Sequence, residues 1–136
     1  MIVKSHMIDE PVFAYAEDSL RQAHERMVAH DIHHLPVVDD DRRVVGIISE
    51  HDVLVPRYLA PGKDRAGRLQ VEASVVVADA MTRDPITLRP SDGLKMAIDQ
   101  LLTHSFNAVP VVDDAGRLVG MLTTKDLLKV LRDQLG

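Results

Sequence analysis

Apolar residues in the second half of the chain follow a helical spacing. After a short predicted β segment at residues 85–88, apolar positions recur at i, i+3, i+4, i+7 and i+8, as in an amphipathic helix. These positions are Leu94, Ala97, Ile98, Leu101 and Leu102. Ser91 is the expected N-cap of this helix, because a serine hydroxyl can accept a hydrogen bond from an unpaired N–H group of the first turn.

Two strands and a second helix are predicted to follow. The apolar run 109–112 predicts a buried strand, the polar residues 113–117 a hairpin loop, and the apolar run 118–122 the returning strand. Thr123 is expected to open the last helix. The apolar residues of that helix are Leu127, Leu128 and Leu131. The elements therefore come in the order β-α-β-β-α.

The first half of the chain repeats this order. Residues 3–54 align with residues 77–128 at a constant offset of 74, and ten of the 23 positions in 32–54 are identical to their counterparts. The predicted elements of the first copy are a helix with Leu20, Ala23, Met27 and Val28 on its apolar face, strands at 35–38 and 44–48, and a helix at 52–58. We therefore predict a first repeat at 1–54, a connector at 55–76 and a second repeat with a C-terminal helix at 77–136.

Composition excludes several classes of protein. The chain of 136 residues has no cysteine, so it has no disulfide, thiolate nucleophile or cysteine-ligated metal. Its net charge of −5 and its 3% aromatic content argue against nucleic-acid binding, which needs a basic face. The charged N-terminal residues exclude a signal peptide, and no apolar run approaches about 18 residues. A cytoplasmic protein that does not enter the membrane is expected.

Charge is distributed unevenly along the chain. Residues 3–54 carry a net charge of −6 and residues 77–128 one of −2, whereas the connector 55–76, which contains proline and glycine, carries +2. The basic connector is interpreted either as a solvated linker or as a flap over an anionic ligand. An acidic protein can therefore still hold an anion.

Both copies carry the same ordered set of short motifs. An apolar-Pro-Val-Val strand, at 35–38 and at 109–112, is followed by an Asp-rich turn and by a Gly-apolar-apolar-Ser/Thr-x-x-Asp segment at 46–52 and at 120–126. This set resembles the CBS domain, named after cystathionine β-synthase. Two such domains in tandem resemble a Bateman module, whose repeats pack about a pseudo-twofold axis and leave two clefts for adenosine-containing ligands.

The resemblance implies an α/β (α+β) fold of two β-α-β-β-α CBS repeats and a regulatory, non-enzymatic role. The implied ligands are AMP, ADP or ATP, with S-adenosylmethionine, NAD and cyclic di-AMP as further candidates, and no cofactor is required. We expect a homodimer that signals to a regulated partner of unknown identity. The alternatives are a ligand-independent interaction scaffold and a regulatory fragment of a larger enzyme or transporter.

The Ser/Thr-x-x-Asp segments also have a physical interpretation of their own. A helix N-terminus presents unpaired N–H groups and the positive end of the helix dipole, which suit a phosphate. A carboxylate one turn later can accept both hydroxyls of a ribose, the role that the family gives this aspartate. The alternative is a capping box, in which the hydroxyl and the acid cap the helix reciprocally. Both roles can coexist.

The resemblance implies that each cleft combines residues of both repeats. The favoured cleft comprises Thr123, Thr124, Lys125, Asp126, Val12, His33 and His34. The other cleft comprises Ser49, Asp52, Ile86, Asn107 and Ala108. We expect the first to bind phosphate more tightly, because Glu50 would repel an anion at the N-terminus of the helix that follows Ser49.

Two other functions are weaker hypotheses. The histidines His30, His33 and His34, with His6, His24 or His51 as distant ligands, could bind a metal, but His33 and His34 should point to opposite faces of a strand. The Asp39-Asp40-Asp41 run corresponds to a hairpin turn in the second copy, which argues against calcium. Ser49 and Ser105 lie outside any Gly-x-Ser-x-Gly motif, so neither is expected to be catalytic, and no metal site is predicted.

Overall fold

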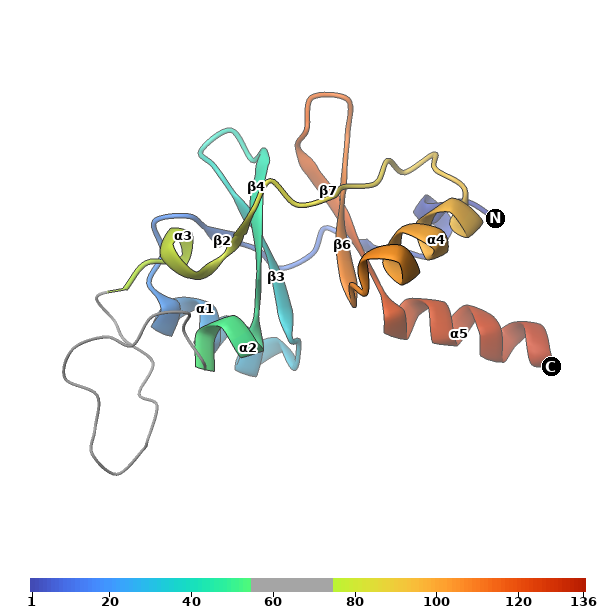
Figure 1. The fold of residues 1–136 in the computed structure, drawn as a ribbon, viewed down its shortest axis with the longest axis horizontal. Coiled ribbons are helices and arrows are strands. Elements are labelled where there is room, and N and C mark those ends of the chain that lie inside the picture. Colours follow the sequence, from blue (N-terminus) through green and yellow to red (C-terminus); the bar gives the residue numbers. More distant parts are fainter. Residues whose placement is uncertain (55–74) are drawn as a thin grey trace. The chain divides into compact units, whose positions relative to one another are not determined.

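The computed structural model describes residues 1–54 and 75–136, and the chain forms two compact units (Figure 1). Unit 1 consists of Met1–Pro11, Asp41–Val44 and Pro85–Gly136. Unit 2 consists of Val12–Asp40 and the described part of Val45–Asp84. The compact units therefore differ from the two sequence copies, because the first residues of each copy pack with the other copy.

Unit 2 contains a mixed four-stranded sheet of order β2-β3-β4-β5. Its strands are β2 (Ala14–Tyr15), β3 (His34–Val38), β4 (Val44–Ser49) and β5 (Thr82–Arg83), and its helices are α1 (Leu20–His30), α2 (Glu50–Leu54) and α3 (Val77–Ala80). Strand β2 runs parallel to β3, whereas β5 is antiparallel to β4. Ser19 and Gln22 form a capping box at the start of α1. Apolar side chains from all three helices and the sheet form one core, which includes Leu20, Met27, Leu35, Ile48 and Val77.

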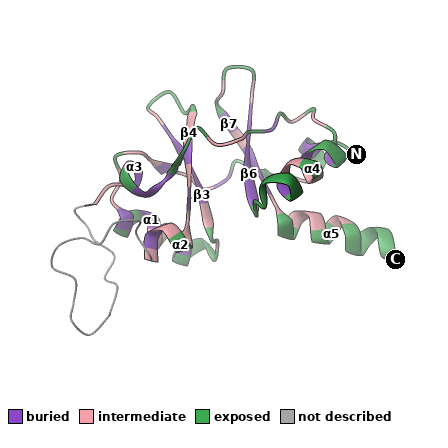
Figure 2. Cartoon of the chain, viewed as in Figure 1, coloured by how far each residue is buried: buried purple, intermediate pink, exposed green. Residues whose placement is uncertain are grey.

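Unit 1 contains a three-stranded antiparallel sheet of order β1-β7-β6. Its elements are the 3-10 helix η1 (Val3–Ser5), β1 (Ile8–Asp9), α4 (Leu94–His104), β6 (Ala108–Val112), β7 (Leu118–Thr123) and α5 (Thr124–Leu135). A separate core includes Val3, Leu88, Leu94, Val111 and Leu122. In Figure 2 the buried residues lie on the strands and on the inner face of α4, whereas α5 has none.

The expected α/β architecture is confirmed, and so is Thr123 as the N-cap of α5. Three local predictions were wrong. Gly93, not Ser91, is the N-cap of α4, and it makes no side-chain capping bond. The segment 85–88 forms only a single parallel bridge, between Leu88 and Val111, and no regular strand.

The third wrong prediction concerns the apolar faces of α1 and α4, the first helix of each copy. The sequence pattern predicts Val28 and Leu102 on these faces, but both side chains are exposed. At about 100° per residue, a residue at i+8 lies about 80° around the helix from residue i, so it falls at the edge of the packed stripe. Residues 55–58 of the predicted helix and residues 55–74 of the predicted connector lie outside the described part of the chain.

Equivalent positions of the two copies share backbone conformations even where their residue types differ. Three pairs of equivalent residues, 74 positions apart, adopt left-handed φ angles. The pairs are Glu10 and Asp84, Asp31 and Ser105, and Arg42 and Gly116. Most L residues avoid this region, so each pair marks a turn that the fold imposes on both copies.

A methionine lies against a glycine at the same place in each copy. A Cβ atom added at Gly46 would clash with the Met81 sulfur and lie 2.9 Å from the carbonyl oxygen of Thr82. At Gly120 it would clash with Met7 and lie 3.1 Å from the Ile8 carbonyl oxygen. Glycine is needed at both positions because neighbouring segments approach the strands closely.

Within the described ranges, no helix combines the length and apolar content that a bilayer crossing needs.

Candidate functional site

The N-terminus of α5 is closed by a complete capping box. The N–H and hydroxyl of Thr123 donate to Oδ2 of Asp126 at 2.8 and 2.7 Å, and the N–H of Asp126 donates to the threonine hydroxyl at 3.3 Å. Within the described residues, Oδ1 of Asp126 accepts no hydrogen bond. The carboxylate therefore caps the helix with one oxygen and keeps the other for a further donor.

The N-terminus of α2 has the same arrangement. The N–H of Ser49 donates to Oδ2 of Asp52 at 2.9 Å, and the N–H of Asp52 donates to the Ser49 hydroxyl at 3.1 Å. Both aspartates are half-buried. The capping role that the sequence left open is thus observed in both copies, and the second carboxylate oxygen leaves room for the ligand role as well.

Each dipeptide before the apolar-Pro motif lies beside the helix of its own unit. The N–H of Glu50 donates to the carbonyl of His33 at 2.8 Å, and the N–H of Thr124 donates to the carbonyl of Asn107 at 2.9 Å. The Thr124 hydroxyl also donates to that carbonyl, at 3.2 Å. The sequence analysis did not predict this local pairing, because an equal separation of 17 residues in both copies follows from the repeat itself and marks no contact.

A histidine, His33, lies beside a carboxylate, that of Glu50, at the start of α2. Nδ1 of His33 lies 2.5 Å from Oε2 of Glu50; the His33 side chain is largely open to solvent, whereas the Glu50 side chain is half-buried. Burial lowers the pKa of His34, and the adjacent His33 lowers it further, while Asp52 opposes part of this shift. His34 therefore favours the neutral imidazole, which can still donate a hydrogen bond to an anionic oxygen.

The structure places the remaining predicted site residues as follows. Lys125 is exposed at the first turn of α5 and makes no hydrogen bond or ion pair within the described residues. Asn107 is exposed and Ala108 is buried, while Val12 and Ile86 are partly buried. Each predicted cleft draws residues from both units, so the two groupings stay predictions.

The described histidines and acidic residues form no metal centre of the usual kind. Among residues 1–54 and 75–136, no group of three or more His, Cys, Asp or Glu side chains is arranged to hold an ion. In the second hairpin, Oδ1 of Asp113 accepts the N–H groups of Ala115 and Arg117 at 2.9 Å each. These backbone bonds, chiefly that of Arg117, lower the pKa of Asp113, so this carboxylate shapes the turn.

The comparisons with known proteins agree with the repeated architecture. The CBS domain family matches residues 3–55 and 77–133. Homoserine O-acetyltransferase of Methanocorpusculum labreanum is 35% identical over 127 residues, which cover 93% of this chain and 23% of that enzyme. The chain thus spans about a quarter of the length of this curated relative.

Two similar solved structures contain adenosine compounds. The CBS domain pair of protein MJ0100, in complex with 5′-methylthioadenosine and S-adenosyl-L-methionine, is 26% identical with a TM-score of 0.80, and the match covers 98% of both chains. CBSX2 in complex with AMP is 26% identical with a TM-score of 0.78, and the match covers 99% of this chain and 98% of that one.

Proposed function

The chain belongs to the CBS domain family, with one CBS domain in each sequence copy, and on this premise we propose that it is a regulatory module that senses an adenosine-containing ligand. The observation that carries the proposal is the pair of capped helix N-termini. In each, an aspartate caps the helix with one carboxylate oxygen, so its other oxygen would be open to a ligand. The adenosine compounds in the two similar structures support the same ligand class.

The geometry suits a nucleoside phosphate. Capping bonds already engage the N–H groups of Asp52 and Asp126. The positive ends of the helix dipoles at the starts of α2 and α5 would still attract a phosphate, and Oδ1 of Asp52 or Asp126 would accept ribose hydroxyls. AMP, ADP and ATP are the proposed ligands, and S-adenosylmethionine, NAD and cyclic di-AMP share the ribose that the aspartate would bind. Catalysis is not part of the proposal, because CBS pairs regulate other proteins or domains.

The two sites are proposed to differ in affinity. The favoured site contains Thr123–Asp126 and is completed by Val12 and the His33–His34 pair. In this site Lys125 supplies a cation at the helix start. The other site contains Ser49 and Asp52 and has Glu50 at the corresponding helix start, where a carboxylate weakens phosphate binding.

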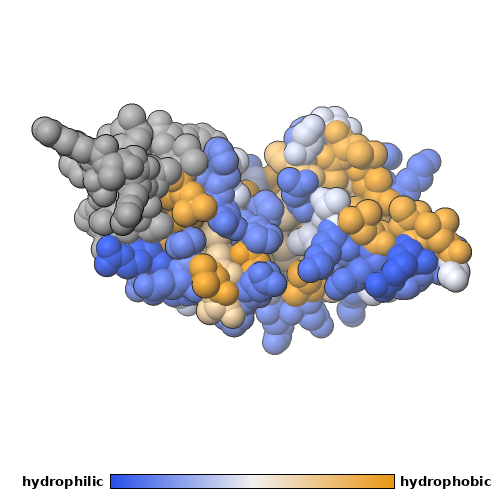
Figure 3. All heavy atoms as spheres, turned by 90° about the horizontal axis from the view of Figure 1, so that it is seen from below, coloured by the Kyte–Doolittle hydropathy of each residue, from blue (hydrophilic) through white to orange (hydrophobic). Residues whose placement is uncertain are grey.

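A second copy of the chain is proposed to cover the outer face of α5. Leu128, Leu131 and Leu135 are 60%, 53% and 78% exposed on this helix. Hydrophobic side chains gather on one face of unit 1, which holds α4 and α5 (orange at the right of Figure 3). A row of exposed leucines on one helix is typical of a helix that packs against a partner. Ligand binding would then change the surface offered to a regulated protein.

The decisive experiment is a thermal-shift series with AMP, ADP, ATP, S-adenosylmethionine, NAD and cyclic di-AMP. A ligand at 100 times its dissociation constant stabilises the folded state by about 2.7 kcal/mol. A shift with at least one compound, confirmed by calorimetric titration, supports the proposal. No shift and no binding heat with any compound would favour the ligand-independent scaffold.

A further inference from the structure

Unit 2 contains a small pocket of about 220 Å³ at the end of α1 and the start of α2, which lie side by side (Figure 1). Its apolar part is formed by Met27, Val28 and Ile32, and polar side chains complete the lining. Val28 is 69% exposed, although the sequence pattern predicts it on the packed face of α1. Small-molecule sites usually enclose about 300–1,000 Å³, so this small pocket suits a side chain of a protein partner better than a whole ligand.

The edge of the small pocket is acidic. Asp31 is the exposed C-cap of α1, and Glu50 is the first residue of α2. Oε2 of Glu50 is already paired with Nδ1 of His33, whereas the Asp31 side chain makes no hydrogen bond or ion pair within the described residues. Among the described residues, none that lines this pocket is a lysine or an arginine. Asp31 is therefore the carboxylate that a cationic partner would meet.

The fold does not require these carboxylates. The second copy has Ser105 in place of Asp31 and Thr124 in place of Glu50, at the constant offset of 74. Ser105 is the C-cap of α4 and adopts a φ of 56°, close to the 51° of Asp31. Since serine makes the same turn, the negative charge at this turn is a feature that unit 2 has and unit 1 lacks.

Helix α5 of unit 1 has a complementary pattern. Its exposed residues Leu128, Leu131 and Leu135 follow one another at i, i+3 and i+7, while Leu127 packs against the core. At about 100° per residue, Leu128 lies between Leu127 and Lys129 around the helix. The helix thus presents a packed face, then an apolar stripe, then a basic edge.

Lys129 is the cation of α5 that is open to a partner. The other basic residues of this helix are Lys125, which the proposed ligand site uses, and Arg132, whose guanidinium lies 3.4 Å from the Asp133 carboxylate. Lys129 is exposed and makes no hydrogen bond or ion pair within the described residues. Leu128 and Lys129 are therefore an adjacent apolar and cationic pair, which matches the apolar and acidic parts of the small pocket.

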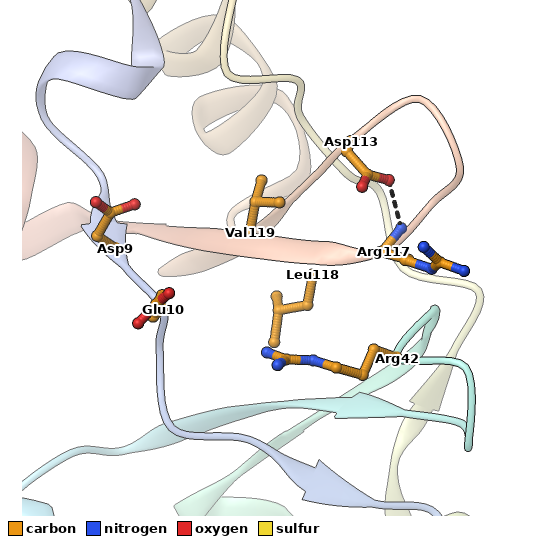
Figure 4. A pocket seen from close by; sticks show the side chains of 7 residues that line it. All are labelled: Asp9, Glu10, Arg42, Asp113, Arg117, Leu118 and Val119. Carbon is orange, nitrogen blue, oxygen red and sulfur yellow. Dashed lines mark hydrogen bonds between the residues drawn. The ribbon is translucent and has the colours of Figure 1, made fainter.

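The charged pocket of unit 1 does not match α5 in this way. It measures about 370 Å³, and the residues that line it include Glu10, Arg42, Arg117 and Val119 (Figure 4). The Arg42 side chain runs beneath Leu118 toward the side on which Glu10 lies, so groups of both signs share the charged pocket. A lysine placed there would meet guanidinium groups as well as carboxylates.

We propose that α5 of a second copy docks on the small pocket of unit 2, with Leu128 against its apolar part and Lys129 paired with Asp31. The inference rests on the proposed homodimer and names the surface that receives α5, so that unit 1 of one chain meets unit 2 of its partner. A twofold axis repeats the contact, and each chain then gives its own α5 and receives that of its partner.

Charge reversal in separate chains tests the contact. Asp31→Lys and Lys129→Glu each place like charges together at both copies of the contact, so each variant alone should dimerise at least about tenfold more weakly than the wild type. In an equimolar mixture of the two variants, the two changes meet at one contact and the two unchanged residues at the other. The mixture should therefore recover dimers. Sedimentation equilibrium of the full-length chains measures each dissociation constant.

Two further variants separate the contact from folding. Asp31→Ser introduces the residue that the second copy has at this turn, so it should keep the urea midpoint and still weaken dimers, by less than Asp31→Lys does. Asp40→Lys makes the same charge change at an exposed aspartate after β3 and should leave the dissociation constant unchanged. Wild-type dimers that survive Asp31→Lys, or a mixture that stays monomeric, would overturn the docking site while the homodimer stands. A monomeric wild-type chain would refute the homodimer and the docking site together.

Discussion

The imidazole Nδ1 of His33 lies 2.5 Å from a carboxylate oxygen of Glu50 at the first turn of α2. A backbone hydrogen bond from the Glu50 N–H to the His33 carbonyl holds the two residues together. The carboxylate that disfavours a phosphate at this helix N-terminus therefore has an imidazole as its partner. The attraction of this site for an anion depends on both residues.

Removing the acid should strengthen nucleotide binding at α2. In Glu50→Gln the proposed site with Ser49 and Asp52 loses a negative charge, and its affinity for AMP should rise by up to about tenfold. His33→Gln leaves Glu50 without its partner and should lower the affinity. Calorimetric titration measures both, with His51→Gln as the neighbouring control. An AMP affinity that is the same in Glu50→Gln and His33→Gln would count against a site at this helix.

The two roles of Asp126 can be separated by substitution. Asp126→Glu keeps an acid that can complete the capping box, whereas Asp126→Ala should lose about 0.5–2 kcal/mol of stability with the cap. Both variants should bind AMP at least about tenfold more weakly, because neither places a carboxylate oxygen correctly for the ribose. Urea unfolding and AMP titration are the measurements. Full AMP affinity in Asp126→Glu would show that the aspartate serves only as a cap.

The close contacts at Gly46 and Gly120 should make both glycines intolerant of substitution. Gly120→Ala forces the new methyl group against Met7, and Gly46→Ala forces it against Met81. Each should cost about 1–3 kcal/mol, as overpacking does elsewhere. Gly93→Ala is the matched control, since nothing lies within 4 Å of the added carbon, and its cost should be confined to a weaker N-cap of α4. Equal urea midpoints for all three variants would contradict this account.

Acidification should destabilise the fold through His34. Its pKa is lowered from the usual 6.5, so the unfolded chain binds a proton more readily than the folded one. Stability should therefore be fully present above about pH 6.5 and fall as the pH drops through the folded-state pKa. Urea unfolding at a series of pH values measures the slope, which His34→Gln should reduce and the exposed His51→Gln should not. An unchanged slope in His34→Gln would assign the effect to other groups.

A charge on the outer face of α5 should prevent self-association. Leu131→Lys places an ammonium group among exposed leucines, where it would be buried in the proposed homodimer without a partner. We expect the wild-type chain to elute as a dimer and the variant as a monomer in size-exclusion chromatography with light scattering, with unfolding at the same urea concentration once dissociated. Arg132→Gln, the adjacent change, is the control. A monomeric wild-type chain would refute the homodimer.

Features that depend on neighbours in the sequence could be predicted from the sequence. The offset of 74 residues revealed the repeat, the apolar runs located β3, β4, β6 and β7, and Thr123 was correctly identified as a cap, because periodicity and capping act within one or two turns of chain. The Ser/Thr-x-x-Asp segments of the candidate site were found for the same reason. Ser91 was mistaken for the cap of α4 because a residue two positions later can also take that place.

Contacts between distant segments were decided only by the tertiary structure. The packing of residues 1–11 with the second copy, the approach of Met7 to Gly120 and the pairing of His33 with Glu50 each join parts of the chain that no local pattern links. The same holds for the charged pocket, which brings Glu10, Arg42 and Val119 together. Sequence periodicity shows which residues are buried, but the identity of their neighbours follows from how the strands and turns pack.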